Sequence, residues 1–194
     1  MILVIDTSSA VSAVALVEPT GEVRREERVP SRSSGLREVL REMAGSAEIT
    51  SVAVATGPGS FTGLRVGVSF GLGLAMGRRV PIVPIPTLTL QAARGRSPVT
   101  AVSEAGRGRF YFQVPRHEVR LGEPREIPTS TPLAGLLSAA SVAALEQAGH
   151  VVVPEGELLG VGEAAAVLLK SIPEVAYDRL KLDYVQAFSA RNPA

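Results

Sequence analysis

The sequence predicts an α/β fold, because short apolar runs alternate with turns and with segments of helix length. Residues 52–55 are apolar, residues 56–65 hold three glycines and a proline, and residues 66–77 carry no charge. An apolar run, a tight turn and a long uncharged segment predict a strand, a turn and a helix. The rest of the chain supplies further strands and helices around this unit.

Composition excludes several classes of protein. With 194 residues and 45% hydrophobic residues, the chain is long enough to bury a sizeable core. It has no cysteine, which excludes disulfides and thiolate metal sites, and its net charge of +1 gives no overall field that binds nucleic acid. No export signal precedes the first apolar run, and residues 66–77 fall short of the roughly 20 residues of a membrane span. We therefore expect a cytoplasmic protein without membrane contact.

The N-terminal residues predict a meander of three strands. Residues 1–5 and 11–17 are apolar runs joined by a polar turn that begins at Asp6, and residues 22–29 are highly charged. A charged strand belongs at a solvated edge of a sheet. In the turn, an aspartate side chain commonly caps its own backbone, so the first interpretation of Asp6 is structural.

Two helices follow from the spacing of apolar residues. Residues 36–43 place apolar side chains on one side and charged side chains on the other, which predicts an amphipathic helix. The helix over residues 62–77 sets glycines at 63, 67 and 71, and its second apolar ridge is Val66, Phe70 and Leu74. Because this helix is apolar on more than one side, we expect its glycine groove to receive another helix, with core packing as the alternative.

The second half predicts weaker elements. We expect a strand over residues 81–85, a helix over 87–93 capped by Thr87, and strands over 99–103 and 110–114 around a Gly106-Arg107-Gly108 turn. A charged strand over residues 118–121 and small-residue helices over 132–137 and 161–169 complete the prediction.

The glycine-rich turn is a candidate anion site, because free backbone N–H groups at a helix start attract negative charge. It lacks the Gly-Lys-Ser or Gly-Lys-Thr of a phosphate loop, and Thr62 stands where a dinucleotide fingerprint needs glycine. A purely structural turn is the alternative. The candidate nucleotide-binding or anion-binding residues, which are small or polar and lie in the two turns, are Asp6, Thr7, Ser8, Gly57, Gly59, Ser60, Thr62 and Gly63.

The motif Gly57-Pro-Gly-Ser-Phe-Thr-Gly-Leu-Arg65-Val-Gly67, together with Ile5-Asp6-Thr7-Ser8, resembles the TsaB (YeaZ) family of tRNA threonylcarbamoyladenosine biosynthesis proteins. The likeness extends over residues 1 to about 95 and thins after that. It implies an actin/Hsp70/sugar-kinase-like fold with two related subdomains of mixed sheet and helices. We place these over residues 1–97 and, in reduced and divergent form, over residues 98–194.

The resemblance implies a non-catalytic scaffold or activating subunit, a paralogue of the catalytic subunit TsaD in a glycoprotease-like superfamily. With the ATPase TsaE, such a complex modifies adenosine 37 of tRNAs that read ANN codons. The chain itself is then expected to need no metal or cofactor, to meet ATP and tRNA only through the complex, to form a homodimer when alone, and to keep its anion loop as a relic. The expected interface residues, which lie on the two helices, are Leu36, Val39, Leu40, Met43, Val66, Gly67, Phe70, Gly71 and Leu74.

A small ATP-dependent kinase or ATPase of the same fold is the alternative. Phosphoryl transfer in this fold needs acidic residues from both halves around magnesium, and the second half offers only Glu104 near a strand end. The two histidines, His117 and His150, are too far apart in sequence for a helical metal pair. ATP turnover separates the two hypotheses, because the kinase hypothesis expects it and the subunit hypothesis does not.

Overall fold

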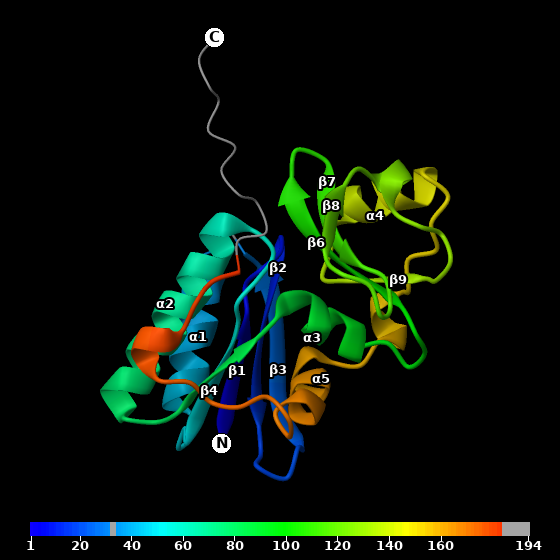
Figure 1. The fold of residues 1–194 in the computed structure, drawn as a ribbon. Helices are drawn as coiled ribbons and strands as arrows, with labels where there is room; N and C mark the ends of the chain where they lie inside the picture. The colour runs from blue at the N-terminus through cyan, green and yellow to red at the C-terminus, as the bar shows by residue number, and fades with distance from the viewer. Residues whose placement is uncertain (32–33, 184–194) are drawn as a thin grey trace.

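A five-stranded mixed sheet lies at the centre of the computed structural model, which describes residues 1–31 and 34–183 (Figure 1). The strand order is β3-β2-β1-β4-β5. Strands β1 and β2 and strands β2 and β3 pair antiparallel, whereas β4 lies parallel to both β1 and β5. The meander is therefore confirmed, and so is the edge position of the charged strand. The strands are β1 (Ile2–Asp6), β2 (Val11–Val17), β3 (Val23–Pro30), β4 (Ser51–Ala55) and β5 (Ile82–Ile85).

Helices cover both faces of this sheet. Helices α1 (Gly35–Gly45) and α2 (Phe61–Arg78) lie on one face, and α3 (Thr87–Ala93) and α5 (Val161–Leu168) lie on the other (Figure 1). Successive strand residues point to opposite faces, so Leu3 packs with the first helix pair and Val4 with the second. The two predicted helices of the first half are confirmed.

A smaller four-stranded sheet organises the second half. Its order is β8-β7-β6-β9, and helix α4 (Ala139–Gln147) packs beside it (Figure 1). The predicted hairpin around Gly106-Arg107-Gly108 is confirmed, since β6 and β7 pair antiparallel on either side of it. The remaining elements of this half are β6 (Thr100–Gly106), β7 (Arg109–Gln113), β8 (Arg120–Gly122), β9 (Leu133–Ala134) and the short 3-10 helices η1 (Pro124–Glu126) and η2 (Glu155–Glu157).

Two local predictions are wrong, and one helix was missed. The helix predicted over residues 132–137 is absent, because β9 pairs in parallel with β6 and the open strand edge outweighs a weak helix preference. Helix α4 was not predicted at all. Thr87 does not cap α3: Pro86 holds the N-cap position, and the Thr87 hydroxyl instead accepts a hydrogen bond from the backbone N–H of Gly57 at 3.1 Å.

After forming the four-stranded sheet, the chain returns to pack against the five-stranded sheet. Strand β6 begins just after residue 97, but α5 packs on β2, and the segment beyond it passes the edge of β5 through a bridge between Val175 and Ile82. The division into residues 1–97 and 98–194 stays a prediction. Among the described helices, none combines the length and the apolar character that crossing a bilayer requires.

Candidate functional site

The two predicted anion-binding turns lie against each other. The backbone N–H of Ser60 donates to the carbonyl oxygen of Ser8 at 2.6 Å, and the Thr7 hydroxyl donates to the carbonyl oxygen of Gly63 at 2.7 Å. The structure therefore brings together the predicted residues of both turns, although they are about fifty residues apart in the chain.

Three backbone donors of this site are already used. Ser60 caps α2, because its hydroxyl accepts from the N–H of Gly63 at 3.3 Å, as expected for a helix N-terminus. The N–H groups of Gly57 and Ser60 donate to Thr87 and Ser8, so the expectation of outward-facing free donors is wrong for these three groups. The outlying member is Thr62, which lies exposed on the first turn of α2.

Asp6 is enclosed below the turns. One carboxylate oxygen accepts from the N–H of Ser8 at 2.9 Å, and the other accepts from the side-chain amide of Gln91 at 2.9 Å. The predicted turn cap is confirmed. Asp6 is fully buried, and this burial raises the pKa of its carboxyl, while the hydrogen bonds from Ser8 and Gln91 and the charge of Arg94 act in the opposite direction.

Arg94 extends this buried network toward the second half and is not among the candidate residues predicted from the sequence. Its side chain is 0% exposed. The guanidinium donates to the Gln91 side-chain oxygen at 3.0 Å and to the carbonyl of Leu159 at 2.9 Å, and it pairs with Glu155. Burial lowers its pKa to about 10, which leaves it charged near neutral pH. The one sequence signal was a glutamine and an arginine one helical turn apart in apolar surroundings.

Glu104 joins the two halves. Its carboxylate accepts from the N–H of Ala10 at 3.1 Å and from the N–H of Ser138 at 2.9 Å, and the hydroxyls of Ser9 and Ser103 lie 3.4 Å apart beside it. The acidic residue considered for phosphoryl transfer thus accepts backbone hydrogen bonds on both sides of the junction. Within residues 1–31 and 34–183, no three His, Cys, Asp or Glu side chains gather in a group that holds a metal.

Asp6→Asn gives a test of this buried carboxyl. Because the folded-state pKa is raised above the ordinary value of 3.8, the folded chain holds the proton more tightly than the unfolded chain. The contribution of the Asp6 carboxyl to the free energy of unfolding is complete below the ordinary pKa of 3.8, and it is lost as the pH rises through the folded-state pKa. We expect the free energy of unfolding of the wild type, minus that of Asp6→Asn, to fall with rising pH and then level. Urea unfolding at a series of pH values measures it, and a difference that rises with pH would contradict this account.

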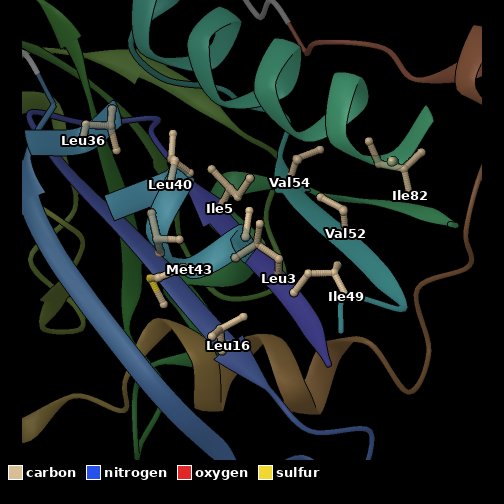
Figure 2. Close-up of a cluster of buried hydrophobic side chains, with 13 residues drawn as sticks. Leu3, Ile5, Leu16, Leu36, Leu40, Met43, Ile49, Val52, Val54 and Ile82 are labelled. Atoms are coloured by element: carbon tan, nitrogen blue, oxygen red, sulfur yellow. The ribbon is translucent and has the colours of Figure 1, made fainter. Parts of the chain in front are cut away.

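The predicted interface is partly wrong. Figure 2 shows the side chains of Leu36, Leu40 and Met43 in one cluster with Leu3 and Ile5 of the sheet, and all of them are buried. Helices α1 and α2 together cover this face of the sheet, so one side of each helix is buried in the chain's own core. These three residues cannot meet a partner in the folded chain.

The glycine groove of α2 also faces inward. A Cβ at Gly67 would collide with the Thr7 hydroxyl, and one at Gly71 would collide with a methyl of Val54. The expected approach of another helix is therefore wrong for these glycines, since the close neighbour is the chain's own sheet. Three other predicted interface residues are half-buried beside the core: Val39, Phe70 and Leu74.

The opposite side of α2 is exposed and nearly uncharged. Phe61, Val66 and Met76 are 46%, 46% and 54% exposed, and a Cβ added at Gly73 or Gly77 would meet open space. We call these five residues the outer face of α2. The Arg65 guanidinium lies 3.8 Å from the centroid of the Phe61 ring, and no charged residue follows until Arg78. Of the predicted interface residues, Val66 is the member that is well exposed here.

Comparison with known proteins gives consistent matches. Residues 34–181 match the family model described as TsaD, tRNA N6-adenosine threonylcarbamoyltransferase. The chain is 34% identical over 132 residues to the tRNA threonylcarbamoyladenosine biosynthesis protein TsaB of Haemophilus influenzae, covering 61% of this chain and 56% of the relative. It is 31% identical over 122 residues to TsaB of Escherichia coli, covering 57% and 53%. The chain therefore spans about half the length of the curated relatives it matches.

Solved structures share the fold. YeaZ from Pseudomonas aeruginosa superposes with a TM-score of 0.65 at 19% identity, over 95% of this chain and 99% of that one. A Pseudomonas aeruginosa protein described as similar to peptidase YEAZ gives a TM-score of 0.67 at 19% identity over the same shares. The α/β architecture with two mixed sheets is that of these proteins.

Proposed function

The chain belongs to the family described as tRNA N6-adenosine threonylcarbamoyltransferase, in its TsaB (YeaZ) branch, and from this premise we propose that it is a non-catalytic subunit of a tRNA-modifying complex. It binds a TsaD-like catalytic subunit, which works with a TsaE-like ATPase on adenosine 37 of tRNAs that read ANN codons. The chain meets ATP and tRNA only through that complex, in the cytoplasm, and it pairs with a second copy of itself when alone.

The observation that supports this function best is the outer face of α2. Phe61, Val66 and Met76 are exposed apolar side chains of one helix, outside its buried stripe of Leu64, Gly67, Gly71 and Ala75. Exposed apolar side chains on one helix favour contact with another protein, because water is displaced from them on docking. Gly73 and Gly77 have no side chain on this surface, so the backbone of a partner helix can approach closely.

The environment of the two turns supports the non-catalytic part of the proposal. In a phosphate-handling site the carboxylate and the loop donors must reach the ligand. Here both oxygens of Asp6 accept hydrogen bonds from the chain, and the donors of Ser60 and Gly63 are satisfied by the chain itself. These residues stabilise the packing of α2 on the sheet, which is a structural role that suits a scaffold.

Val66→Glu tests the docking surface. Val66 points away from the core, so the variant folds, but a glutamate at the centre of the interface must lose its hydration without a partner charge. We expect binding to the TsaD-like subunit and self-association to weaken by about a hundredfold or more. Calorimetric titration with the TsaD-like subunit, and light scattering of the chain alone, measure the two effects.

The matched control is Val167→Glu, because Val167 is a 58% exposed valine on α5, a helix of the other sheet face. This control should bind and self-associate like the wild type. Phe70→Glu is unsuitable as a probe, since Phe70 packs against the core and its replacement would destabilise the fold. Wild-type binding by folded Val66→Glu would place the interface elsewhere and refute the proposed surface.

A further inference from the structure

The last described segment of the chain runs beside α2. Residues 172–183, which we call the strap, include the 3-10 helix η3 (Tyr177–Arg179) and follow α2 in Figure 1 as the orange-to-red ribbon. The N–H of Val175 donates to the carbonyl of Ile82 at 3.0 Å, and the N–H of Asp183 donates to the carbonyl of Thr56 at 2.8 Å. The strap therefore bonds to the chain beyond both ends of the helix.

Tyr177 connects the strap directly to the end of α2. Its hydroxyl lies 2.8 Å from the carbonyl oxygen of Val80 and 3.2 Å from that of Ala75, so its proton is shared between them. The carbonyl of Ala75 also accepts from the N–H of Val80 at 3.0 Å, so the hydroxyl is a further donor at the turn that ends the helix. The ring of Tyr177 packs against the core with Val175 and Leu180.

The turn that Tyr177 contacts is costly to form. Helix α2 ends at a left-handed residue, Arg79, with a φ of 56° where helices commonly use glycine. A residue with a Cβ is strained in this conformation, so the turn depends on contacts from outside the helix. Arg78 supplies another such contact by donating to the carbonyl of Ala44 in α1 at 2.6 Å.

We propose that Tyr177 is a positioning residue for partner docking, because the strap holds the final turn of α2 in the place that the partner recognises. That turn carries Met76 and Gly77, which form the C-terminal part of the outer face of α2. This inference rests on the proposed function. It adds that the affinity for the partner depends on a residue outside the outer face.

The test replaces Tyr177 by phenylalanine, which removes the hydroxyl and keeps the ring. The control is Ser171→Ala, because the Ser171 hydroxyl donates to the carbonyl of Leu168 at 3.1 Å, at the end of α5 and outside the strap. For Tyr177→Phe we expect faster amide hydrogen exchange at residues 79 and 80 and a roughly three- to tenfold weaker affinity for the TsaD-like subunit. Ser171→Ala should change neither quantity.

Measuring Val66→Glu in the same titration separates the two ideas. If Val66→Glu loses binding and Tyr177→Phe weakens it together with faster exchange, the inference is supported. If Val66→Glu loses binding while Tyr177→Phe binds like the wild type, the strap has no positioning role and the proposed function stands. If Val66→Glu binds normally, the docking surface is wrong and the inference is overturned with it.

Discussion

Replacing Arg94 with methionine is expected to lower the free energy of unfolding by on the order of 3 kcal/mol. Methionine fills much of the same volume but donates no hydrogen bond. The carbonyl of Leu159 and the side-chain oxygen of Gln91 then lose a buried donor, and the enclosed carboxylate of Asp6 loses the positive charge nearest to it. Removing one member of a buried charged network costs more than removing the whole network, because the remaining groups stay desolvated.

Arg96→Met is the control for this effect. Arg96 lies two residues further along and is exposed, and its guanidinium donates to the carbonyl of Glu157 at 3.3 Å. Its removal should cost about 0.5 kcal/mol or less. Urea unfolding of both variants at neutral pH measures the difference. Equal losses for the two arginines would show that the network around Arg94 contributes little to stability.

A methyl group at Gly63 is expected to have a similarly large effect. In the folded chain a Cβ at this position would lie well inside contact distance of the Thr7 carbonyl oxygen, which is backbone and cannot rotate away. Gly63→Ala must therefore separate α2 from the turn that holds Thr7, and we expect a loss of about 3 kcal/mol in the free energy of unfolding. The same helix offers a matched position, since a Cβ at Gly73 meets open space.

Gly73→Ala should raise the free energy of unfolding by about 0.5–1 kcal/mol, because alanine loses less backbone entropy than glycine in a helix interior. Thermal and urea unfolding of both alanine variants give the comparison. The distinctive result is a lower free energy of unfolding for Gly63→Ala and a higher one for Gly73→Ala. If both substitutions stabilise the chain, α2 does not approach the turn at Thr7 as closely as the structure places it.

Local pattern was enough to predict the elements of the first half. The spacing of apolar residues over 36–43 predicted α1, and the uncharged length of residues 62–77 predicted α2, because one buried side sets a helical period. The same reasoning failed over residues 132–137. Small residues there have no strong preference, and pairing with β6 decided their conformation.

The orientation of α2 could not be predicted for a related reason. Its sequence is apolar on more than one side, so periodicity alone leaves open which side meets the sheet. Contact of Gly67 with Thr7 and of Gly71 with Val54 decides it, and the outer face follows as what remains. The predicted interface was wrong for Leu36, Leu40 and Met43 because burial is a property of the assembled sheet and helices.

By itself, the sequence determined the α/β class, the order of the N-terminal elements and the turn role of Asp6, since each depends on residues close together in the chain. The tertiary structure alone decided that Asp6 meets Gln91, 85 residues away, and that Arg94 joins them to Glu155. A buried charge is tolerated only where opposite charges and hydrogen-bond partners surround it, and those partners come from distant segments brought together by folding.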